Sequence, residues 1–206
     1  MNADYTTMVL LTYTPGSDVE SKGYDDWLRE TDNPFFNTIP GIAHYSNWKV
    51  LEGADAPFTH FDLLGLDGPD AVEKVWFNAD LDTFRDGWVA NWGYGGSAPR
   101  SPANGYGLLV RRDQPTDPIF DRYVALAFDR VLPSGSVWTA EAALHKHWAL
   151  GPAPEGKWRR PVASSTLGSS FSLRFGSALP SLPAGSPGAP RLVGECIAAP
   201  EMPWRA

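Results

Sequence analysis

The stretch IPGIAHYSNWKV (residues 39–50), followed by FTHFDLLGL (58–66), decides the fold expected for this chain of 206 residues. After the turn at Pro40-Gly41, residues 42–50 and 58–66 are predicted to be strands. The connection LEGADAP between them is short and ends in proline. Two strands joined in this way are typical of an antiparallel hairpin.

Elements before and after this hairpin complete a βαββαβ order. The apolar run TTMVLLTYT (6–14) predicts a strand, and helical periodicity follows over residues 21–38. Beyond the hairpin, helical patterns cover residues 68–78 and 81–92, and YGLLVRR (106–112) predicts a further strand. This order is that of a ferredoxin-like unit.

The first predicted helix contains its own break. Tyr24, Trp27 and Leu28 are spaced as one apolar helical face. Asp32-Asn33-Pro34 follows, and the residue before a proline avoids the helical region. We expect the helix to end or to kink there.

The second half predicts the same plan with its second helix lost, although the two halves have no visible sequence match. The fold class is therefore α+β, with a ferredoxin-like unit over residues 1–114 and a degenerate second unit over residues 115–206. The predicted elements of the second unit are a strand at 122–131, an Ala- and Leu-rich helix at 137–150, a hairpin of 161–168 and 170–176, a non-helical loop at 177–190 and a strand at 191–199.

The central hairpin carries a polar face. Side chains alternate along a strand, so the pairing register decides which of them lie together. The simplest register places Ser46 opposite Asp62 and Trp48 opposite His60, and a slip of one residue would scramble the assignment. The predicted polar face consists of His44, Ser46, Trp48, His60, Asp62 and Leu64, while Tyr45, Asn47, Phe61 and Leu63 are expected to pack against the helices.

Two imidazoles and a carboxylate on one surface can move protons. Histidine titrates near neutral pH, and a neighbouring carboxylate fixes its tautomer and raises its basicity. We expect His44 to transfer the proton, Asp62 or Ser46 to orient it, and His60 to be a second carrier. The alternative is that these polar residues simply face solvent. The predicted substrate-binding residues are Ser46, Trp48, Leu64, Trp76 and Trp88, of which the last two can equally be helix core.

Composition excludes several other classes. The net charge of −7 is unsuited to a nucleic-acid surface, and the chain has neither a long apolar span nor a basic, cleavable leader. The single cysteine, Cys196, excludes an internal disulfide and a thiolate zinc cluster, so a reducing cytoplasm is expected. His145 and His147 would lie about 200° apart on a helix, too far round to share a metal. No metal or cofactor is predicted.

The first half resembles the dimeric α/β-barrel superfamily. The resemblance rests on the strand MVLLTYTPG, the acidic helix YDDWLRETDNPFF and the turn into a strand IPGIAHYSNWKV, and it covers about half the chain. It implies that two four-stranded sheets face each other around a cavity lined by His44. The long second half leaves two arrangements open, a tandem barrel within one chain or a barrel between two chains, and we expect a homodimer.

These observations predict a cofactor-free tailoring enzyme of the cyclase or isomerase type, which acts on a small aromatic polyketide or bisindole intermediate by acid–base chemistry. The alternatives are a cofactor-independent or haem-dependent oxygenase on the same fold, and a ligand-binding protein without turnover. Fold alone does not decide between them.

Overall fold

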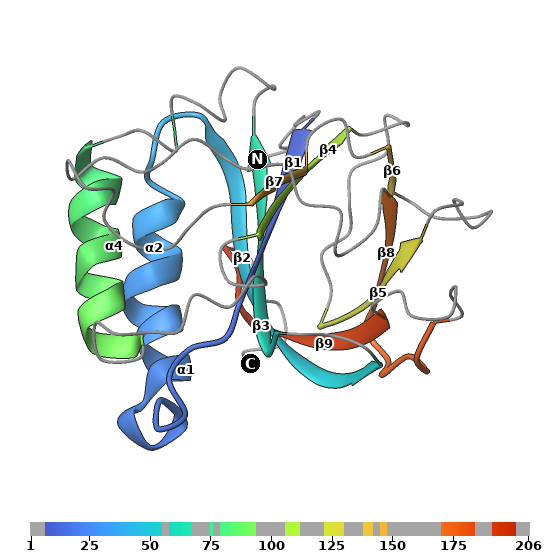
Figure 1. Cartoon of the computed structure of the whole chain (residues 1–206), viewed down its shortest axis with the longest axis horizontal. Helices are drawn as coiled ribbons and strands as arrows, with labels where there is room; N and C mark the ends of the chain where they lie inside the picture. The colour runs from blue at the N-terminus through green and yellow to red at the C-terminus, as the bar shows by residue number, and fades with distance from the viewer. Residues whose placement is uncertain are drawn as a thin grey trace.

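The described part of the chain is an α+β structure in which helical segments cover one face of a curved antiparallel sheet (Figure 1). The computed structural model describes residues 7–54, 58–66, 75, 79–93, 106–111, 122–129, 138–141, 145–147, 170–183 and 191–200. Its helical segments are η1 (Glu20–Lys22), α1 (Tyr24–Trp27), η2 (Leu28–Asp32), α2 (Asn33–Phe36) and α4 (Ala79–Trp92).

The described strands form one sheet in the order β6-β8-β5-β9-β2-β3-β1-β4-β7, with every neighbouring pair antiparallel. β4 also contacts β6, so the ends of the sheet approach each other as it curves. The strands are β1 (Thr7–Tyr13), β2 (Ile42–Ala54), β3 (His60–Leu66), β4 (Tyr106–Arg111), β5 (Tyr123–Asp129), β6 (Trp138–Glu141), β7 (His145–His147), β8 (Ser170–Gly176) and β9 (Arg191–Ala198).

Most strand predictions are confirmed, and one helix prediction is wrong. The expected strands of the first half are β1 to β4, and those at 122–131, 170–176 and 191–199 are β5, β8 and β9. The expected helix at 137–150 contains two strands instead, because β6 pairs with β8 and β7 pairs with β4. Helix propensity is weak, and strand pairing outweighs it. The expected strand at 161–168 lies outside the described residues.

The first helix continues past the predicted break by widening. In η2 the backbone N–H of Asn33 bonds to the carbonyl of Leu28, five residues back, which is the pattern of a π-helical turn. Pro34 has no N–H to give to the preceding turn, so the widened turn is a physical consequence of its ring. Helical structure then runs on through α2 to Phe36.

The predicted register of the hairpin is wrong by one residue. β2 and β3 pair so that Asn47 lies opposite Asp62 and Ser46 lies opposite Leu63. β2 is irregular between Ile42 and His44, and this register divides the predicted polar residues between the two faces of the sheet.

The face turned away from the helices is packed with aromatic and apolar side chains. The rings of Trp48 and Phe61 are stacked with centroids 6.0 Å apart, and Phe175 of β8 lies 5.7 Å from Trp48. Gly194 lets the chain pass beneath Phe61, because an added Cβ would meet that ring at 2.8 Å and 2.9 Å. This apolar packing joins the second half of the chain to the first.

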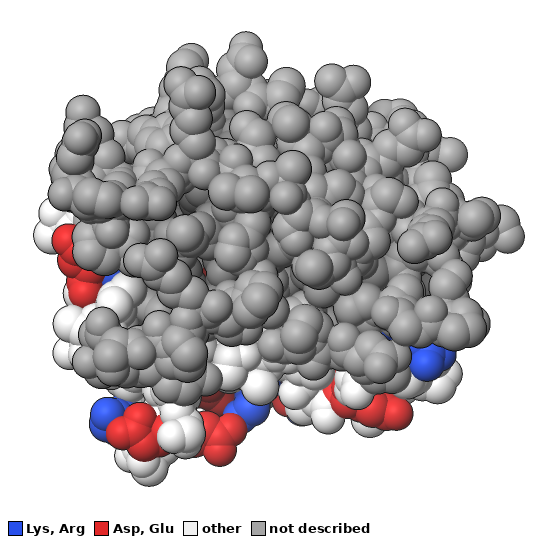
Figure 2. All heavy atoms as spheres, viewed as in Figure 1, with Lys and Arg blue, Asp and Glu red and all other residues white. Residues whose placement is uncertain are grey.

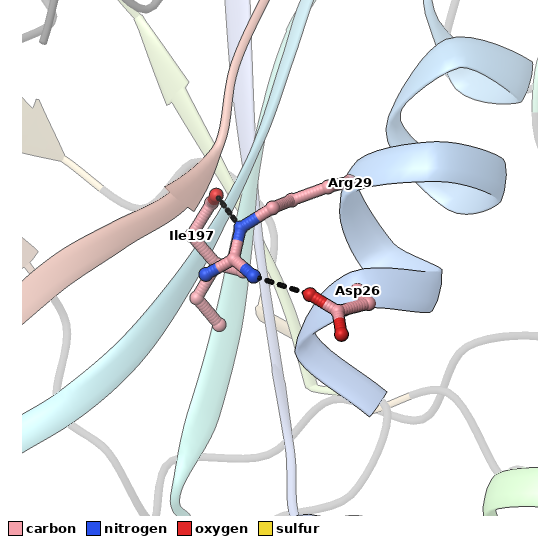
Figure 3. A network of polar contacts seen from close by, with 3 residues as sticks. All are labelled: Asp26, Arg29 and Ile197. Atoms are coloured by element: carbon pink, nitrogen blue, oxygen red, sulfur yellow. Dashed lines mark hydrogen bonds and ion pairs between the residues drawn. The ribbon is translucent and has the colours of Figure 1, made fainter. Parts of the chain in front are cut away.

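The helical layer is fastened to the sheet by apolar clusters and by Arg29. Its guanidinium donates to the carbonyl of Ile197 in β9 at 3.2 Å and to Asp26 at 2.9 Å (Figure 3). The two apolar clusters between helices and sheet contain Leu11, Phe36, Ile39, Tyr45, Leu64, Leu66, Val75 and Leu81, and Tyr13, Val19, Tyr24, Leu28 and Ile197.

Several charged side chains of the described residues form ion pairs at the surface. Lys22 pairs with Asp18, Lys49 with Glu20, and Arg122 with Glu195, and both acidic and basic atoms are visible along the lower edge of the view in Figure 2. No helix in this part of the chain is long and apolar enough to cross a membrane.

We predict that Gly194→Ala destabilises the protein by about 1–3 kcal/mol, because the new methyl group overpacks the interior against Phe61. Gly87→Ala is the matched control. Gly87 lies exposed in α4 with open space around it, so this change should stabilise by roughly 0.5–1 kcal/mol. Urea unfolding measures both, and equal stability of Gly194→Ala and wild type would contradict the packing.

Candidate functional site

Beneath the helices lies a buried group that we call the carboxyl cluster, made of Asp32 from η2, Asp62 from β3, Tyr13 from β1, and Tyr45 and Asn47 from β2. All five side chains are buried. The two carboxyl groups come from different layers of the structure, and the π-helical turn places one of them against the sheet. Such turns are frequent at functional sites.

Asn47 connects the two carboxyl groups. Its amide nitrogen lies 2.7 Å from Oδ2 of Asp32 and 3.0 Å from Oδ1 of Asp62. The hydroxyl of Tyr45 donates to the same oxygen of Asp32 at 2.8 Å, and the hydroxyl of Tyr13 donates to Oδ1 of Asp62 at 3.1 Å. Both acids are thus bonded to donors, as buried polar groups must be.

Burial holds protons on this cluster. It raises the pKa of Asp32 to about 7, against the opposing effect of hydrogen bonds from Asn47 and Tyr45. Burial, and after it the charge of Asp32, raises the pKa of Asp62 well above its usual range. When two buried carboxyls interact, ionising one makes ionising the other harder, so the two titration steps are properties of the pair and not of either residue alone. The pair therefore holds a proton near neutral pH, when an isolated aspartate would have none.

A series of hydroxyl groups leads from the pair toward the surface. Tyr13, which donates to Asp62, has the buried Tyr24 beside it, and the two side chains are close enough for Tyr13 to affect the pKa of Tyr24. Tyr24 in turn accepts a hydrogen bond from the indole N–H of Trp88 at 2.9 Å. Trp88 is half-buried, whereas both tyrosines are buried and burial raises their pKa well above the usual range. The hydroxyls stay protonated and can pass a proton along the series.

His60 lies beside this series. Its ring stacks on Tyr13 with centroids 5.7 Å apart and meets the edge of Tyr24 at 5.6 Å. Nδ1 lies 3.0 Å from the hydroxyl of Thr59, and buried Nε2 has no hydrogen-bond partner among the described residues. Burial, with a smaller effect of Lys49, lowers the pKa of His60 to about 4. The imidazole is therefore neutral near pH 7.

The predicted site residues fall on opposite faces of the sheet. His60, Asp62 and Leu64 lie on the helix-facing side, with Tyr45 and Asn47, while Phe61 and Leu63, which were expected there, lie on the other face. His44, Ser46 and Trp48 share that other face. The one-residue register difference separates the two predicted imidazoles.

On the face turned away from the helices, the predicted residues bond to one another. The indole N–H of Trp48 donates to the hydroxyl of Ser46 at 2.9 Å, and both side chains are fully buried. Ser46 therefore orients the indole. Burial lowers the pKa of His44 to about 4, so this imidazole is neutral as well. Of the two predicted helix tryptophans, Trp88 joins the hydroxyl series, and Trp76 lies outside the described residues.

Sequence reasoning missed Asp32, Tyr13, Tyr24, Tyr45 and Asn47 as site members. Asp32 was interpreted only as part of a helix-ending motif. The available signal was the spacing of Leu28 and Asp32, four residues apart, which puts a carboxyl on the same helical side as a buried leucine. An acid on the apolar side of a helix calls for a polar partner on the facing sheet.

The described residues include no group of three or more His, Cys, Asp or Glu side chains placed to hold a metal ion. No protein family model, curated protein or solved structure matches this chain. The chemistry of the site must therefore be argued from its own residues.

The carboxyl groups and the histidines should give the unfolding free energy opposite dependences on pH. From the ordinary carboxyl pKa of about 3.9 up to about 7, the folded chain binds more protons at Asp32 than the unfolded chain, so the unfolding free energy falls as pH rises. At His44 and His60 the folded pKa of about 4 lies below the ordinary value of roughly 6.5. There the unfolded chain binds more protons, and the unfolding free energy rises with pH.

We predict that Asp32→Asn makes the slope of unfolding free energy against pH more positive than in wild type between about pH 4 and 6.5, and that His60→Gln makes it more negative. Each lost proton changes the slope by up to about 1.4 kcal/mol per pH unit. Urea unfolding at several pH values measures the slopes. Parallel curves for wild type and both variants would show that neither group has a shifted pKa.

Proposed function

We propose that this chain is a small-molecule tailoring enzyme that moves protons on an aromatic substrate. The observation that carries the proposal is the bonding of two buried carboxyls, Asp32 and Asp62, to one amide nitrogen. A carboxyl pair that keeps a proton near neutral pH offers an acid and a base in one place. Enolisation removes a proton from carbon and gives one to oxygen, and isomerisation and cyclisation can both proceed through such an enol.

The helix-facing side offers a place for an aromatic ring. Trp27, Trp88 and Trp92 are half-buried and pack on the cluster that contains Tyr24. Trp27 and Trp92 lie 5.9 Å and 5.1 Å from the Tyr24 ring. A flat substrate bound against these indoles would stack favourably. It would then lie at the outer end of the hydroxyl series.

Roles follow from the bonding. The ionised member of the carboxyl pair takes the proton that leaves carbon, by way of the hydroxyls of Tyr24 and Tyr13. The same hydroxyls then return the proton from the pair to the substrate, and His60, the second predicted carrier, stays neutral and donates a hydrogen bond to the enolate oxygen in between. Positioned acid–base groups of this kind contribute about 10²–10⁴-fold to rate. His44, on the far face of the sheet, has no part in this mechanism.

The proposal includes a ferredoxin-like unit closed within one chain. The strand order β2-β3-β1-β4, with helices on one face, supports such a unit for the first half. β9 occupies the edge of β2, and β4 contacts β6, so the second half supplies the sheet that faces the first. Of the two arrangements that the sequence left open, this supports the tandem arrangement over a barrel between two chains.

We expect light scattering to give a mass near the 22.5 kDa of one chain. The large hydrophobic side chains exposed in the described part of the chain are Leu51 and Leu179, which do not call for a partner surface. A mass of twice that value would instead favour the homodimer and a barrel completed between chains.

Proton transfer can be tested without knowing the natural substrate. We predict that the protein accelerates exchange of the α-protons of aryl ketones such as 1-tetralone into deuterated buffer, followed by NMR. Tyr13→Phe should slow this exchange by about 10²-fold or more, because it cuts the path to Asp62 while keeping the ring. Tyr123→Phe, the same chemical change on β5, should leave the rate within about twofold.

A second matched pair locates the site. His60→Gln should lower the exchange rate, whereas His44→Gln, a change of an equally neutral imidazole on the opposite face, should not. Loss of exchange in His44→Gln alone would move the site to the other face of the sheet. Failure of the wild-type protein to accelerate exchange of any aryl ketone tested would refute the proposed reaction class.

A further inference from the structure

Three asparagine side chains form a directed series that ends at the carboxyl cluster. The amide nitrogen of Asn37 donates to Oδ1 of Asn33 at 3.1 Å, and the amide nitrogen of Asn33 donates to Oδ1 of Asn47 at 3.0 Å. The amide nitrogen of Asn47 then donates to both carboxyl groups. Each amide gives its hydrogen to the next, so the orientation of one sets the orientation of its neighbour.

The direction of the series is fixed at its outer end by the backbone. Oδ1 of Asn37 accepts from the backbone N–H of Tyr45 at 2.9 Å, and its nitrogen donates to the carbonyl of Tyr45 at 3.1 Å. A reversed amide would set oxygen against oxygen and nitrogen against nitrogen. Asn33 also donates to this carbonyl at 3.0 Å, so the same backbone group fixes two of the three side chains.

We propose that Asn33 is a positioning residue for the carboxyl cluster. The side-chain N–H of Asn33 holds the amide of Asn47 so that the nitrogen of Asn47, and not its oxygen, faces Asp32 and Asp62. A donor facing a carboxyl group favours the ionised form. A reversed Asn47 would present a lone pair, and both carboxyls would then need protons. The inference rests on the proposed function only where it connects this protonation state with catalysis.

Among the described residues, none of the other groups that face the carboxyl pair carries a positive charge that would stabilise the ionised carboxyls in place of the Asn47 amide. Tyr13, Tyr24 and Tyr45 come from β1, α1 and β2, and burial keeps each hydroxyl protonated by raising its pKa. His60 on β3 is neutral, and the nearby Lys49 is paired with Glu20. Arg29 of η2 is bonded to Asp26 and Ile197. The Asn47 amide is thus the group whose reversal changes the electrostatics of the pair most directly.

The test is a carbon-13 NMR titration of the aspartate side-chain carboxyls in the full chain without substrate. Asn33→Leu removes the donor to Asn47 without adding charge. Asn33→Asp replaces that donor by an acceptor, so the Asn47 amide would turn its nitrogen toward residue 33 and its oxygen toward the carboxyl pair. We expect both to move the titration of the pair to higher pH, by about one pH unit or more, with the larger shift for Asn33→Asp. Asn91→Asp, on exposed α4, is the matched control and should not shift it.

Wild-type protein gives a second readout that does not depend on the variants folding. The side-chain nitrogen-15 signal of Asn47 should follow the carboxyl titration with the same midpoint. The inference would be overturned if the titration is unshifted in both folded Asn33 variants. It would also be overturned if the chemical shift of the Asn47 nitrogen does not change over the pH range of the carboxyl titration. If the titration behaves as expected but no α-proton exchange occurs in wild type, only the proposed reaction fails.

Discussion

The pairing register of β2 with β3 is the constraint on which the rest of the site depends. Side chains alternate across both strands, so every residue of the hairpin is assigned to a face once one pair is fixed. The observed pairing puts Asn47 beside Asp62 under the helices, and Trp48 beside Phe61 on the other face. A slip of one residue on β3 would exchange Asp62 for an aromatic ring and leave a carboxyl inside the apolar packing. The cost of burying an unpaired charge makes that alternative unstable.

The second requirement is an acid delivered from the helical layer. Pro34 cannot complete an ordinary helical turn, and the widened turn before it presents Asp32 to the hydroxyl of Tyr45 and the amide of Asn47. Two carboxyls from two layers then share donors, so the cluster is also a joint between helices and sheet. Its strength depends on keeping a proton, because two buried like charges would drive the layers apart.

The sequence predicts much of the fold but not the hairpin register. The strands at 6–14 and 191–199 could be predicted because they are rich in β-branched and apolar residues, which are typical of buried strands. A seven-residue connection does not fix pairing as a two-residue turn does, and β2 extends through Ala54 into what was expected to be the connection. The helix expected at 137–150 failed for a related reason, since strand pairing partners are distant in sequence and local propensity does not contain them.

The candidate site was predictable in its composition and unpredictable in its grouping. Asp62 and His60 were predicted to share a face, which their spacing of two residues ensures in any register, but that face is the one under the helices and not the one turned away from them. His44 was grouped with them only through the pairing, and it lies on the opposite side. The sheet thus separates two neutral imidazoles by a layer of backbone. One face, with Trp48, Phe61 and Gly194, supplies tight apolar packing, and the other buries hydrogen-bonded acids that can exchange protons. Apolar packing and the hydrogen-bonded acids use alternate residues of the same strands. The side chains on one face can therefore pack tightly without disturbing the hydrogen bonds of the acids on the other face.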